Sequence, residues 1–487
     1  METRGDKKLS SHVYYNISII NNTTTDLATT GIATRDPQIR FNETRDKALI
    51  EDASKYYFSI VRFSMNGPNR NLPLFIPVIQ LGQSNPNLTT YSTGLTLQQT
   101  WNVSTLANAT GQISFNITPA PVFALWIPEI QNTSVAPVPG PPTTVQDLAS
   151  KYYFCGTYQW WLNIVNTTLT SSYQALYTAF AAAWAVAVAT DLSNNPFPYP
   201  TFLSFQAAVC NTPQITYDPV SHLFSVWMDS RAFGSPLIPF AAVPYSAGVP
   251  GAATSPRIRL FMNTNMYGLF ANIPSIFWNT TSPLASLVVG DTAYDSFGAV
   301  TPAGYTYEIT AVNQFFQNVV DFRQSPYGAP VPFVANPTTL QQPYYKMTQD
   351  FPSDDSLWSP IESIVFASSL LPVKTEQVAQ PTVFGQGNIG LSAATSASAF
   401  TPIITDIALD TTVGGAAAYR QFISYAPAAE YRLSDFGPSK VAIQNVDVFV
   451  YWKNRLDGQL YPISMYNLSS VSLKILFRLK ESQKDDQ

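Results

Sequence analysis

Short apolar segments rich in aromatic and β-branched residues recur along the chain and predict β-strands. The stretch from Lys55 to Gln80, KYYFSIVRFSMNGPNRNLPLFIPVIQ, contains two of them. The later stretch NPNLTTYSTGLTLQ alternates apolar and polar residues, as a half-buried strand does. Proline supplies no hydrogen-bond donor to a sheet, so Pro73 and Pro77 place their segment at a sheet edge, a strand start or a bulge.

The C-terminal region gives the clearest strand pattern. In NVDVFVYWKNRLDGQLYPISM the Asp457-Gly458 pair is a strong hairpin signal between two apolar runs. In SVSLKILFRLK the alternation predicts one buried face and one opposite face. The apolar face consists of Leu473, Ile475, Phe477 and Leu479, and the opposite face carries Lys474, Arg478 and Lys480.

One long helix is expected among the strands. Residues 158–192, YQWWLNIVNTTLTSSYQALYTAFAAAWAVAVATDL, lack Gly and Pro, and their second half is rich in Ala. We expect this helix to pack on a sheet. After it, ITYDPVSHLFSVWM predicts two strands around an Asp218-Pro219 turn, and the Pro-, Gly-, Ser- and Ala-rich residues 233–256 and 384–400 predict long loops.

The number and spacing of these segments predict a mainly β protein. Many short strands, Pro-rich turns and 13% aromatic residues favour a single antiparallel jelly-roll sandwich. A chain of 487 residues exceeds the roughly 250–300 at which one core stops growing, so a second module or a large insertion is expected. Residues 1–50 are polar with mixed charges, and we expect an arm that orders only against another molecule.

Composition narrows the possible functions. Charged residues make up only 12% of the chain, and the net charge is −5, which offers no overall basic surface for gripping phosphates. Sequence-specific nucleic-acid binding is therefore not expected. A surface poor in charge suits burial against neighbouring molecules.

The residues of common catalytic and metal sites are missing from the sequence pattern. The 2 cysteines, Cys155 and Cys210, and the 2 histidines leave little material for a metal site, so no metal and no cofactor are expected. There is no GxSxG, HExxH, GxxxxGK[ST] or GxGxxG motif. Asp354 and Asp355 are adjacent in a loop, which favours a turn over a facing catalytic pair. We expect no catalytic residues and no enzyme activity.

The ends of the chain and its apolar runs predict a soluble protein made inside a cell. The N-terminus, METRGDKKLSSHV, is charged where a signal peptide would be apolar, and the longest apolar run is shorter than the roughly 20 residues of a membrane span. Arg4, Gly5 and Asp6 form the integrin-binding tripeptide and are a candidate partner-binding site. A tripeptide of this kind also arises by chance in a chain of this length.

Several segments together resemble a known family. In this order, YYFSIVRFSMNGPNRNLPLFIPVI, NPNLTTYSTGLTL, YYFCGTYQWWLNIVNTTL, FMNTNMYGLF, LWSPIESIVFASSLLPV, YAPAAEYRLSDF and VDVFVYWKNRLDGQLYPISMYNLSSVSLKILF are similar to the penton (minor capsid) proteins of polinton-like viruses, polintons and virophages. The resemblance covers roughly residues 55–480. No single motif carries it alone.

The resemblance implies a vertical jelly roll with an inserted upper domain, assembled as a homopentamer at the icosahedral vertices of a double-stranded DNA virus capsid. We expect residues 51–96 and 211–487 to form the jelly roll and residues 97–210, with the helix, to form the insertion. The implied partners are trimers of a double-jelly-roll major capsid protein and other minor capsid or vertex proteins. The implied location is the virion.

Two questions stay open at the level of sequence. A virion-attached or extracellular β-sandwich that binds or cleaves glycans, and an attachment spike on the vertex, are alternatives to the penton. The basic side chains Lys474, Arg478 and Lys480 either form an inner face against packaged DNA or an acidic neighbour, or are solvated without a partner.

Overall fold

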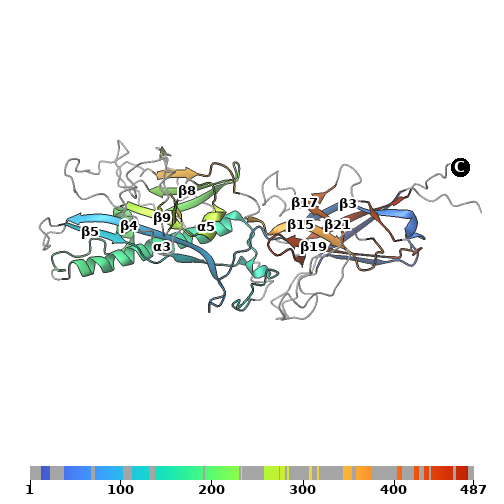
Figure 1. Ribbon diagram of the computed structural model, residues 1–487, viewed down its shortest axis with the longest axis horizontal. Coiled ribbons are helices and arrows are strands. Elements are labelled where there is room, and N and C mark those ends of the chain that lie inside the picture. Colours follow the sequence, from blue (N-terminus) through green and yellow to red (C-terminus); the bar gives the residue numbers. More distant parts are fainter. Residues whose placement is uncertain are drawn as a thin grey trace, which may run out of the picture.

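The computed structural model describes two lobes that lie end to end along the long axis of the molecule (Figure 1). The described residues are 12–21, 38–66, 72–102, 112–130, 138–189, 192–229, 232, 257–273, 275–279, 282–283, 307–309, 315–316, 344–353, 358–374, 403–408, 422–426, 433–437, 440–463, 465 and 468–480. We call described residues 12–66 and 361–480 the jelly-roll lobe, and described residues 72–353 the insertion lobe. One hydrophobic cluster includes side chains from both.

The jelly-roll lobe contains two antiparallel sheets in jelly-roll order. The first sheet has the order β1-β21-β3-β17, with β18 also paired to β3, and the second has the order β16-β15-β19-β2, with β20 also paired to β19. We number the eight strands of these two orders along the chain, leaving out β18 and β20. The sheets then read 1-8-3-6 and 5-4-7-2, which is the order of a jelly roll. Their bounds are β1 His12–Ile20, β2 Arg40–Thr44, β3 Tyr56–Asn66, β15 Ile361–Ala367, β16 Ile403–Ala408, β17 Phe422–Tyr425, β18 Ser434–Asp435, β19 Asn445–Asn454, β20 Leu460–Pro462 and β21 Ser470–Leu479. The predicted fold class is confirmed.

Aromatic side chains fill the space between the two sheets. On the inner side of the first sheet, the Phe477 ring of β21 lies 5.6 Å from the Phe58 ring of β3, edge to face. Between the sheets, Phe63 of β3 lies 5.0 Å from Phe366 of β15. Leu473, Ile475 and Phe477 are fully buried, as the alternation along β21 predicts.

The predicted hairpin joins β19 to β20. Gly458 has φ +67°, a conformation that costs glycine little. The Asp457 carboxylate accepts hydrogen bonds from the Gln459 N–H at 2.9 Å and from the Tyr461 hydroxyl at 2.6 Å. The Asp-Gly pair therefore turns the chain as its sequence predicts.

The insertion lobe is built from two further sheets and one long helix. A sheet of order β11-β10-β12-β9-β4-β5, with β6 also paired to β4, is one of them, and the order β13-β14-β8-β7 is the other. The bounds are β4 Leu88–Asn102, β5 Gln112–Ile117, β6 Val122–Leu125, α3 Tyr158–Ala187, α4 Phe202–Ala208, β7 Gln214–Asp218, β8 Leu223–Asp229, β9 Arg257–Met262, α5 Thr264–Leu269, β10 Ser275–Asn279, β11 Ser282–Pro283, β12 Tyr307–Ile309, β13 Phe315–Phe316 and β14 Tyr344–Thr348. Short 3₁₀ helices at Ala53–Lys55 and Lys151–Tyr153 precede β3 and α3.

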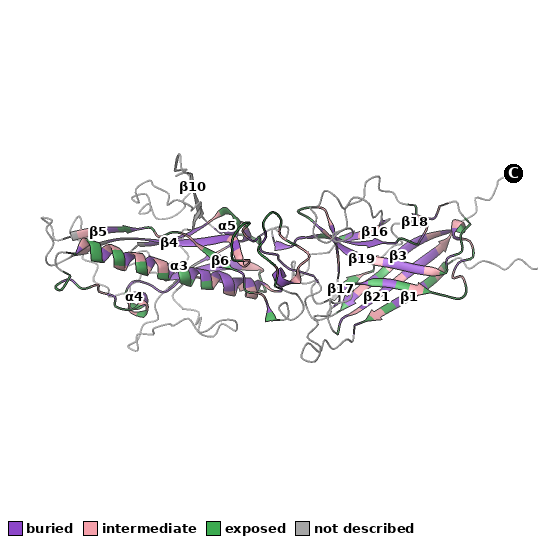
Figure 2. Cartoon of the chain, turned by 90° about the horizontal axis from the view of Figure 1, so that it is seen from below, coloured by how far each residue is buried: buried purple, intermediate pink, exposed green. Residues whose placement is uncertain are grey.

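Helix α3 packs one face against the strands of this lobe, as predicted. The Thr157 side chain caps its start by accepting from the Trp160 N–H at 3.1 Å. Buried side chains recur every three or four residues from Trp161 through Leu169 to Trp184, and the opposite side is exposed (Figure 2). The helix ends at Ala187, before the predicted residue 192.

The division of the chain between the lobes differs from the sequence-based boundaries. Residues 12–20 and 40–44, expected in a free arm, pair as β1 with β21 and as β2 with β19. The described strands that begin within residues 72–96 and 211–353, namely β4 and β7 to β14, were expected in the jelly roll but pair in the sheets of the insertion lobe. Every described strand between β3 and β15 therefore belongs to the insertion lobe. Short apolar strands occur in both lobes, so local pattern does not reveal which sheet a strand joins.

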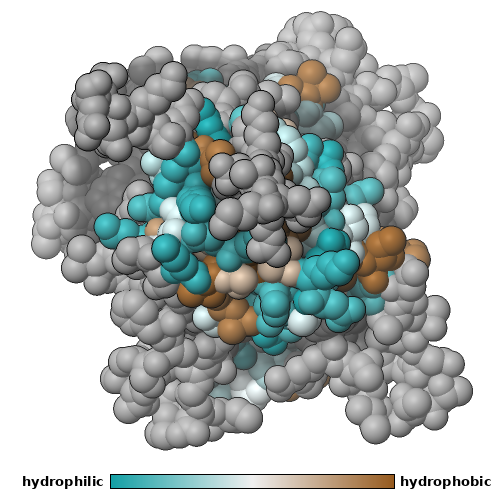
Figure 3. All heavy atoms as spheres, turned by 90° about the vertical axis from the view of Figure 1, so that its right-hand side faces the viewer, coloured by the Kyte–Doolittle hydropathy of each residue, from teal (hydrophilic) through white to brown (hydrophobic). Residues whose placement is uncertain are grey.

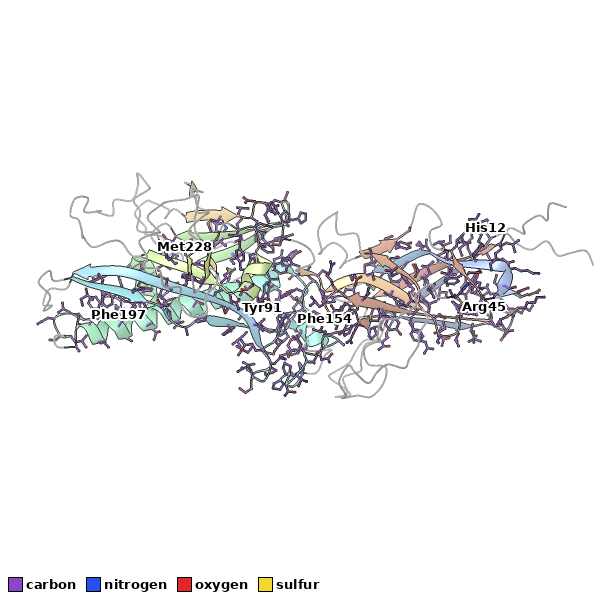
Figure 4. The ribbon with its side chains drawn as sticks, in the orientation of Figure 1. His12, Arg45, Tyr91, Phe154, Phe197 and Met228 are labelled. Carbon is purple, nitrogen blue, oxygen red and sulfur yellow. The ribbon has the colours of Figure 1, made fainter. Side chains whose placement is uncertain are left out.

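An aromatic cluster holds the two ends of the insertion together. Trp358 immediately precedes the return to β15, is 2% exposed, and lies 5.5 Å from Phe75 on the outgoing segment. Its ring also contacts Tyr158 at 4.9 Å and stacks on Phe224 at 5.2 Å. In Figure 4, Tyr91 and Phe154 mark this end of the insertion lobe, while His12 and Arg45 mark the far end of the jelly-roll lobe.

Replacing Trp358 by Ala should lower the free energy of unfolding by about 3–5 kcal/mol, the range for a large aromatic side chain removed from a core. The residues that leave and re-enter the jelly roll should also become more sensitive to protease. The matched control is Trp160→Ala on α3, since this tryptophan is only half-buried. Denaturant unfolding and limited proteolysis measure both effects, and equal losses in the two variants would contradict the assigned role.

Deleting residues 1–21 should destabilise the jelly roll, since β1 is part of its first sheet. Tyr15 and Ile17 of β1 are 5% and 9% exposed. At roughly 1.5–3 kcal/mol for each buried large side chain, their loss alone predicts about 3–6 kcal/mol. Deletion of residues 1–11 is the control, because it leaves β1 whole. Equal soluble yield and equal urea midpoints for both deletions would show that β1 is dispensable.

Candidate assembly surfaces

The outer side of the first sheet is an open face formed by β1, β21 and β3. The register places His12 beside Arg478 and Tyr57, Tyr14 beside Leu476 and Ser59, and Asn16 beside Lys474 and Arg62. Tyr14 is 52% exposed, and Arg62 is also exposed. Figure 2 shows exposed residues along β1. We call the outward side chains of His12, Tyr14, Tyr57, Arg62, Lys474 and Arg478 the basic face.

The structure brings the predicted basic residues together with a cation that sequence reasoning missed. Lys474 and Arg62 stand directly opposite each other across β21 and β3, next to a β-bulge. The Lys474 ammonium lies 4.5 Å above the Tyr14 ring. Neither Lys474 nor Arg62 forms an ion pair with any described residue. Like charges placed directly opposite each other in a sheet destabilise it.

Lys480 is held differently from the other two predicted cations. It forms an ion pair with Asp435 of β18, and its ammonium lies 5.2 Å from the centre of the Tyr57 ring. Lys474, Arg478 and Lys480 are all half-buried. They lie opposite the core side chains of β21, as predicted. The Arg4-Gly5-Asp6 tripeptide lies outside the described residues.

Leu476 shows where simple alternation along β21 was incomplete. It lies in the same outward series as Lys474 and Arg478, yet it is fully buried between Tyr14 of β1 and Ser59 of β3. The sequence does contain the signal, because leucine interrupts an otherwise polar series. The basic face therefore has a buried apolar residue at its centre, surrounded by cations and a tyrosine.

The outer side of the second sheet is packed instead of open. Val365, Ala367, Ile403, Tyr451 and Leu460 form a hydrophobic cluster separate from the main core. Burial is the main cause that raises the pKa of Tyr451 to about 12, and the nearby Asp447 carboxylate adds to it. The exposed charge on this side includes Glu362, which accepts from Lys453 at 2.9 Å.

A buried charge anchors one edge of the second sheet. The Asp447 side chain is fully buried and accepts from Arg40 Nε at 3.0 Å and from the Ser369 hydroxyl at 2.9 Å. The Arg40 guanidinium also lies 4.5 Å above the Phe449 ring. The Asp447 carboxylate thus joins β19, which carries it, to β2 and to the segment after β15. It therefore fixes the relative position of these three parts.

The insertion lobe presents an apolar surface without charge. Phe123, Leu125 and Ile127 point outward along β6 and the residues after it, and each is more than a third exposed. Val78 lies across β4 on the same side, because the Thr90 N–H donates to its carbonyl at 2.9 Å. Residues 72–102 and 112–128 contain no Asp, Glu, Lys or Arg. Exposed apolar patches of this kind mark contact surfaces.

The described residues contain no group of three or more His, Cys, Asp or Glu side chains placed to hold a metal ion. Cys155 and Cys210 are both free and buried. His222 sits in the β7–β8 turn and pairs through Nδ1 with the Tyr217 hydroxyl at 3.0 Å. Asp354 and Asp355 lie outside the described residues.

Among the described helices, none is both long and apolar enough to span a bilayer.

The sequence profile of the Sputnik minor capsid protein V18/19 family matches residues 13–479. The chain belongs to this family. The match covers almost every described strand of both lobes and confirms the resemblance to virophage minor capsid proteins. The chain is therefore a minor capsid protein, a structural component of a virion.

A chain of one solved virophage structure shares the fold of this minor capsid protein. A chain in the cryo-EM structure of the Sputnik virophage shares 20% sequence identity with it at a TM-score of 0.58, over 97% of this chain and 99% of that chain. The crystal structure of the mavirus penton protein matches at 12% identity and a TM-score of 0.44, over 97% of this chain and 100% of that chain. Comparison with curated proteins finds no match.

Replacing Arg40 by Met should lower the free energy of unfolding of the minor capsid protein, because Asp447 would lose its cation while staying buried. We expect a loss of about 1–3 kcal/mol, below the value for a fully buried pair, since the Arg40 side chain is 47% exposed. Adding Asp447→Asn should recover part of the loss. The control, Lys453→Met, breaks the exposed pair with Glu362 and should change the free energy by less than about 1 kcal/mol. Denaturant titration of the variants measures these differences, and an equal effect of Arg40→Met and Lys453→Met would contradict the argument.

Proposed function

We propose that this minor capsid protein is the penton of its particle, five copies of which form a ring at each icosahedral vertex. The observation that carries the proposal is the single jelly roll, with one insertion confined to one end of its long axis (Figure 1). Family membership supports a place in the capsid.

The geometry of the jelly-roll lobe suits a ring of upright subunits. The pairing of β3 with β21 shows which end of the lobe faces the insertion. Asn66, the last residue of β3, leads into the insertion, whereas Tyr56, its first residue, pairs with Leu479 at the opposite end. The outer faces of both sheets therefore run alongside the long axis, where lateral neighbours would lie. At the end opposite the insertion, hydrophilic residues cover much of the coloured surface, with hydrophobic patches between them (Figure 3).

The neighbours of the ring would be trimers of the double-jelly-roll major capsid protein and other minor capsid or vertex proteins. A chain with only 12% charged residues and an uncharged apolar patch on the insertion lobe has surface suited to such contacts. We further infer that the role is structural and that the chain catalyses no reaction.

The full-length protein, alone or co-expressed with the major capsid protein, should form pentamers of roughly 268 kDa, five times 53.5 kDa. Light scattering and native mass spectrometry measure the mass, and electron microscopy of particles shows the position of the pentamer. Monomers or trimers under both conditions would overturn the proposal.

A further inference from the structure

We propose that strand β1 of one subunit pairs with strand β17 of the next subunit in the ring, so that their first sheets form one continuous sheet. The inference rests on the proposed pentamer and adds to it which strands meet. β1 and β17 are the two end strands of the order β1-β21-β3-β17, so each has one side without a described neighbour in the sheet. Sides of this kind are where the sheets of separate molecules join.

The side of β1 that faces away from β21 offers unpaired main-chain groups. The Asn21 N–H donates to the Ser469 carbonyl at 2.9 Å, and the Asn21 carbonyl accepts from the Leu468 N–H at 2.8 Å. Paired and unpaired main-chain groups alternate along an edge strand, so Ser18 and Ile20 direct theirs away from β21. Among the described residues, β1 pairs with no strand other than β21. The free side of β1 is therefore a template for one more strand.

The sequence of β1 does not protect this edge from pairing. Exposed edge strands are usually very short, or they carry charges or proline. β1 is nine residues long and contains no Asp, Glu, Lys, Arg or Pro. Both edges of the second sheet do carry charge, with Arg40 and Glu43 on β2 and Asp406 on β16. β17, at the other edge of the first sheet, is uncharged like β1.

The directions of the strands allow this pairing in a ring. Each strand of the first sheet is antiparallel to its neighbour, so β1 and β17 of one subunit run in opposite directions. In a ring whose axis lies along the strands, every copy keeps the same direction. β1 of one copy therefore meets β17 of the next as an antiparallel pair, through a heterologous contact of the kind that closes rings. Pairing of β1 with a second β1 needs a two-fold axis instead and stops at a dimer.

The register of the sheet brings the two free edges to the same height. Ser18 of β1 lies opposite Ser472 of β21, and Ser472 lies opposite Ser64 of β3. Ser64 in turn lies opposite Ser424 of β17. These four serines form one row across the sheet, and a neighbour rotated about the ring axis brings its Ser424 level with Ser18.

The main-chain groups in this row also match. Because Ser18 faces away from β21, Ser472 directs its N–H and carbonyl toward Ser64. The groups of Ser64 are thereby occupied, and Ser424 directs its own away from β3. Ser18 and Ser424 of adjacent copies can therefore exchange both hydrogen bonds of an antiparallel pair.

The side chains of the two edges are alike on each face of the sheet. Ser18 and Ser424 are both exposed. In the next row, Ile423 is buried in the main hydrophobic cluster, and Ile19 is partly buried against the same cluster. The pairing thus continues an apolar row on the core side and a serine row on the outer side, which fixes the register to steps of two residues.

The first experiment cross-links the two edges in the full-length chain. Residues in a hydrogen-bonded antiparallel pair have Cα atoms about 5.5 Å apart, which a disulfide can bridge. Ser18→Cys with Ser424→Cys should therefore give, on oxidation of purified pentamers, a reducible ladder of up to five linked chains on a denaturing gel. The native Cys155 and Cys210 are buried and should not interfere.

Three controls define what the cross-link means. Ser18→Cys alone and Ser424→Cys alone should give no linked chains. Ile19→Cys with Ser424→Cys should also stay unlinked, because the two thiols would lie on opposite faces of the sheet. Linked dimers from Ser18→Cys alone would indicate β1 paired with β1 and would overturn the inference.

The second experiment removes one donor from the free edge. Ser18→Pro should leave the hydrogen bonds between β1 and β21 in place, since proline is tolerated where the N–H faces away from the sheet. It should weaken pentamer formation by roughly tenfold or more, because a buried carbonyl of β17 would lose its partner. Tyr14→Pro is the control, since it makes the same change on the same side of β1 but beyond the rows that β17 occupies.

The outcomes are distinguishable by native mass spectrometry and gel analysis. If the native chain forms no pentamers, the proposed function fails. If native pentamers form but Ser18→Cys with Ser424→Cys yields no linked chains, the proposed function stands and this inference is overturned. Equal pentamer stability in Ser18→Pro and Tyr14→Pro, with both variants folded by circular dichroism, also overturns it.

Discussion

The structure depends on closing one very long connection between two neighbouring parts of the jelly roll. β3 and β15 lie in different sheets, and their side chains meet in the core, with the Phe63 and Phe366 rings 5.0 Å apart. The chain between them leaves after Asn66 and returns at Ile361, at one end of the jelly roll (Figure 1). The entropy of closing a loop grows only slowly with its length, so a large insertion is tolerated if its ends are held. The Phe75–Trp358 contact holds them from the insertion side.

The two sheets of the jelly-roll lobe end up with different outer surfaces. The second sheet buries an apolar cluster and the Asp447 carboxylate on its outer side, and it shows water a mixture of charges. The first sheet shows tyrosines, serines and cations. Two unlike sides are what the proposed ring requires, because each head-to-tail contact joins two different surfaces.

Local pattern predicted those parts of the fold that local interactions determine. The alternation in β21, the Asp457-Gly458 turn and the start of α3 at Tyr158 all follow from neighbouring residues. The partners of β1 and β2 could not be predicted in this way. Each of these strands pairs with residues about four hundred or more positions away along the chain, as Tyr15 does with Ile475. The domain boundaries in the sequence analysis differ from the lobes for the same reason.

The candidate surfaces were predictable to the same limited extent. Alternation found Lys474, Arg478 and Lys480, since they share one strand. It missed Arg62, because only the pairing of β3 with β21, shifted by a bulge, brings that side chain opposite Lys474. It also missed the outward row of Phe123, Leu125 and Ile127, because exposure of large apolar side chains is a property of the assembled lobe.

Because charged residues are only 12% of the chain, the places where they gather distinguish one surface of the protein from another. The insertion lobe has long uncharged segments and an exposed apolar patch, whereas the cations of β3 and β21 gather on one face of the jelly roll. Apolar contacts supply affinity but little selectivity, while paired charges select partner and register and speed association. A subunit that must find its neighbours in one orientation gains from separating the two functions. The short length of β6, four residues, also limits the edge that the apolar patch offers to unspecific strand pairing before assembly.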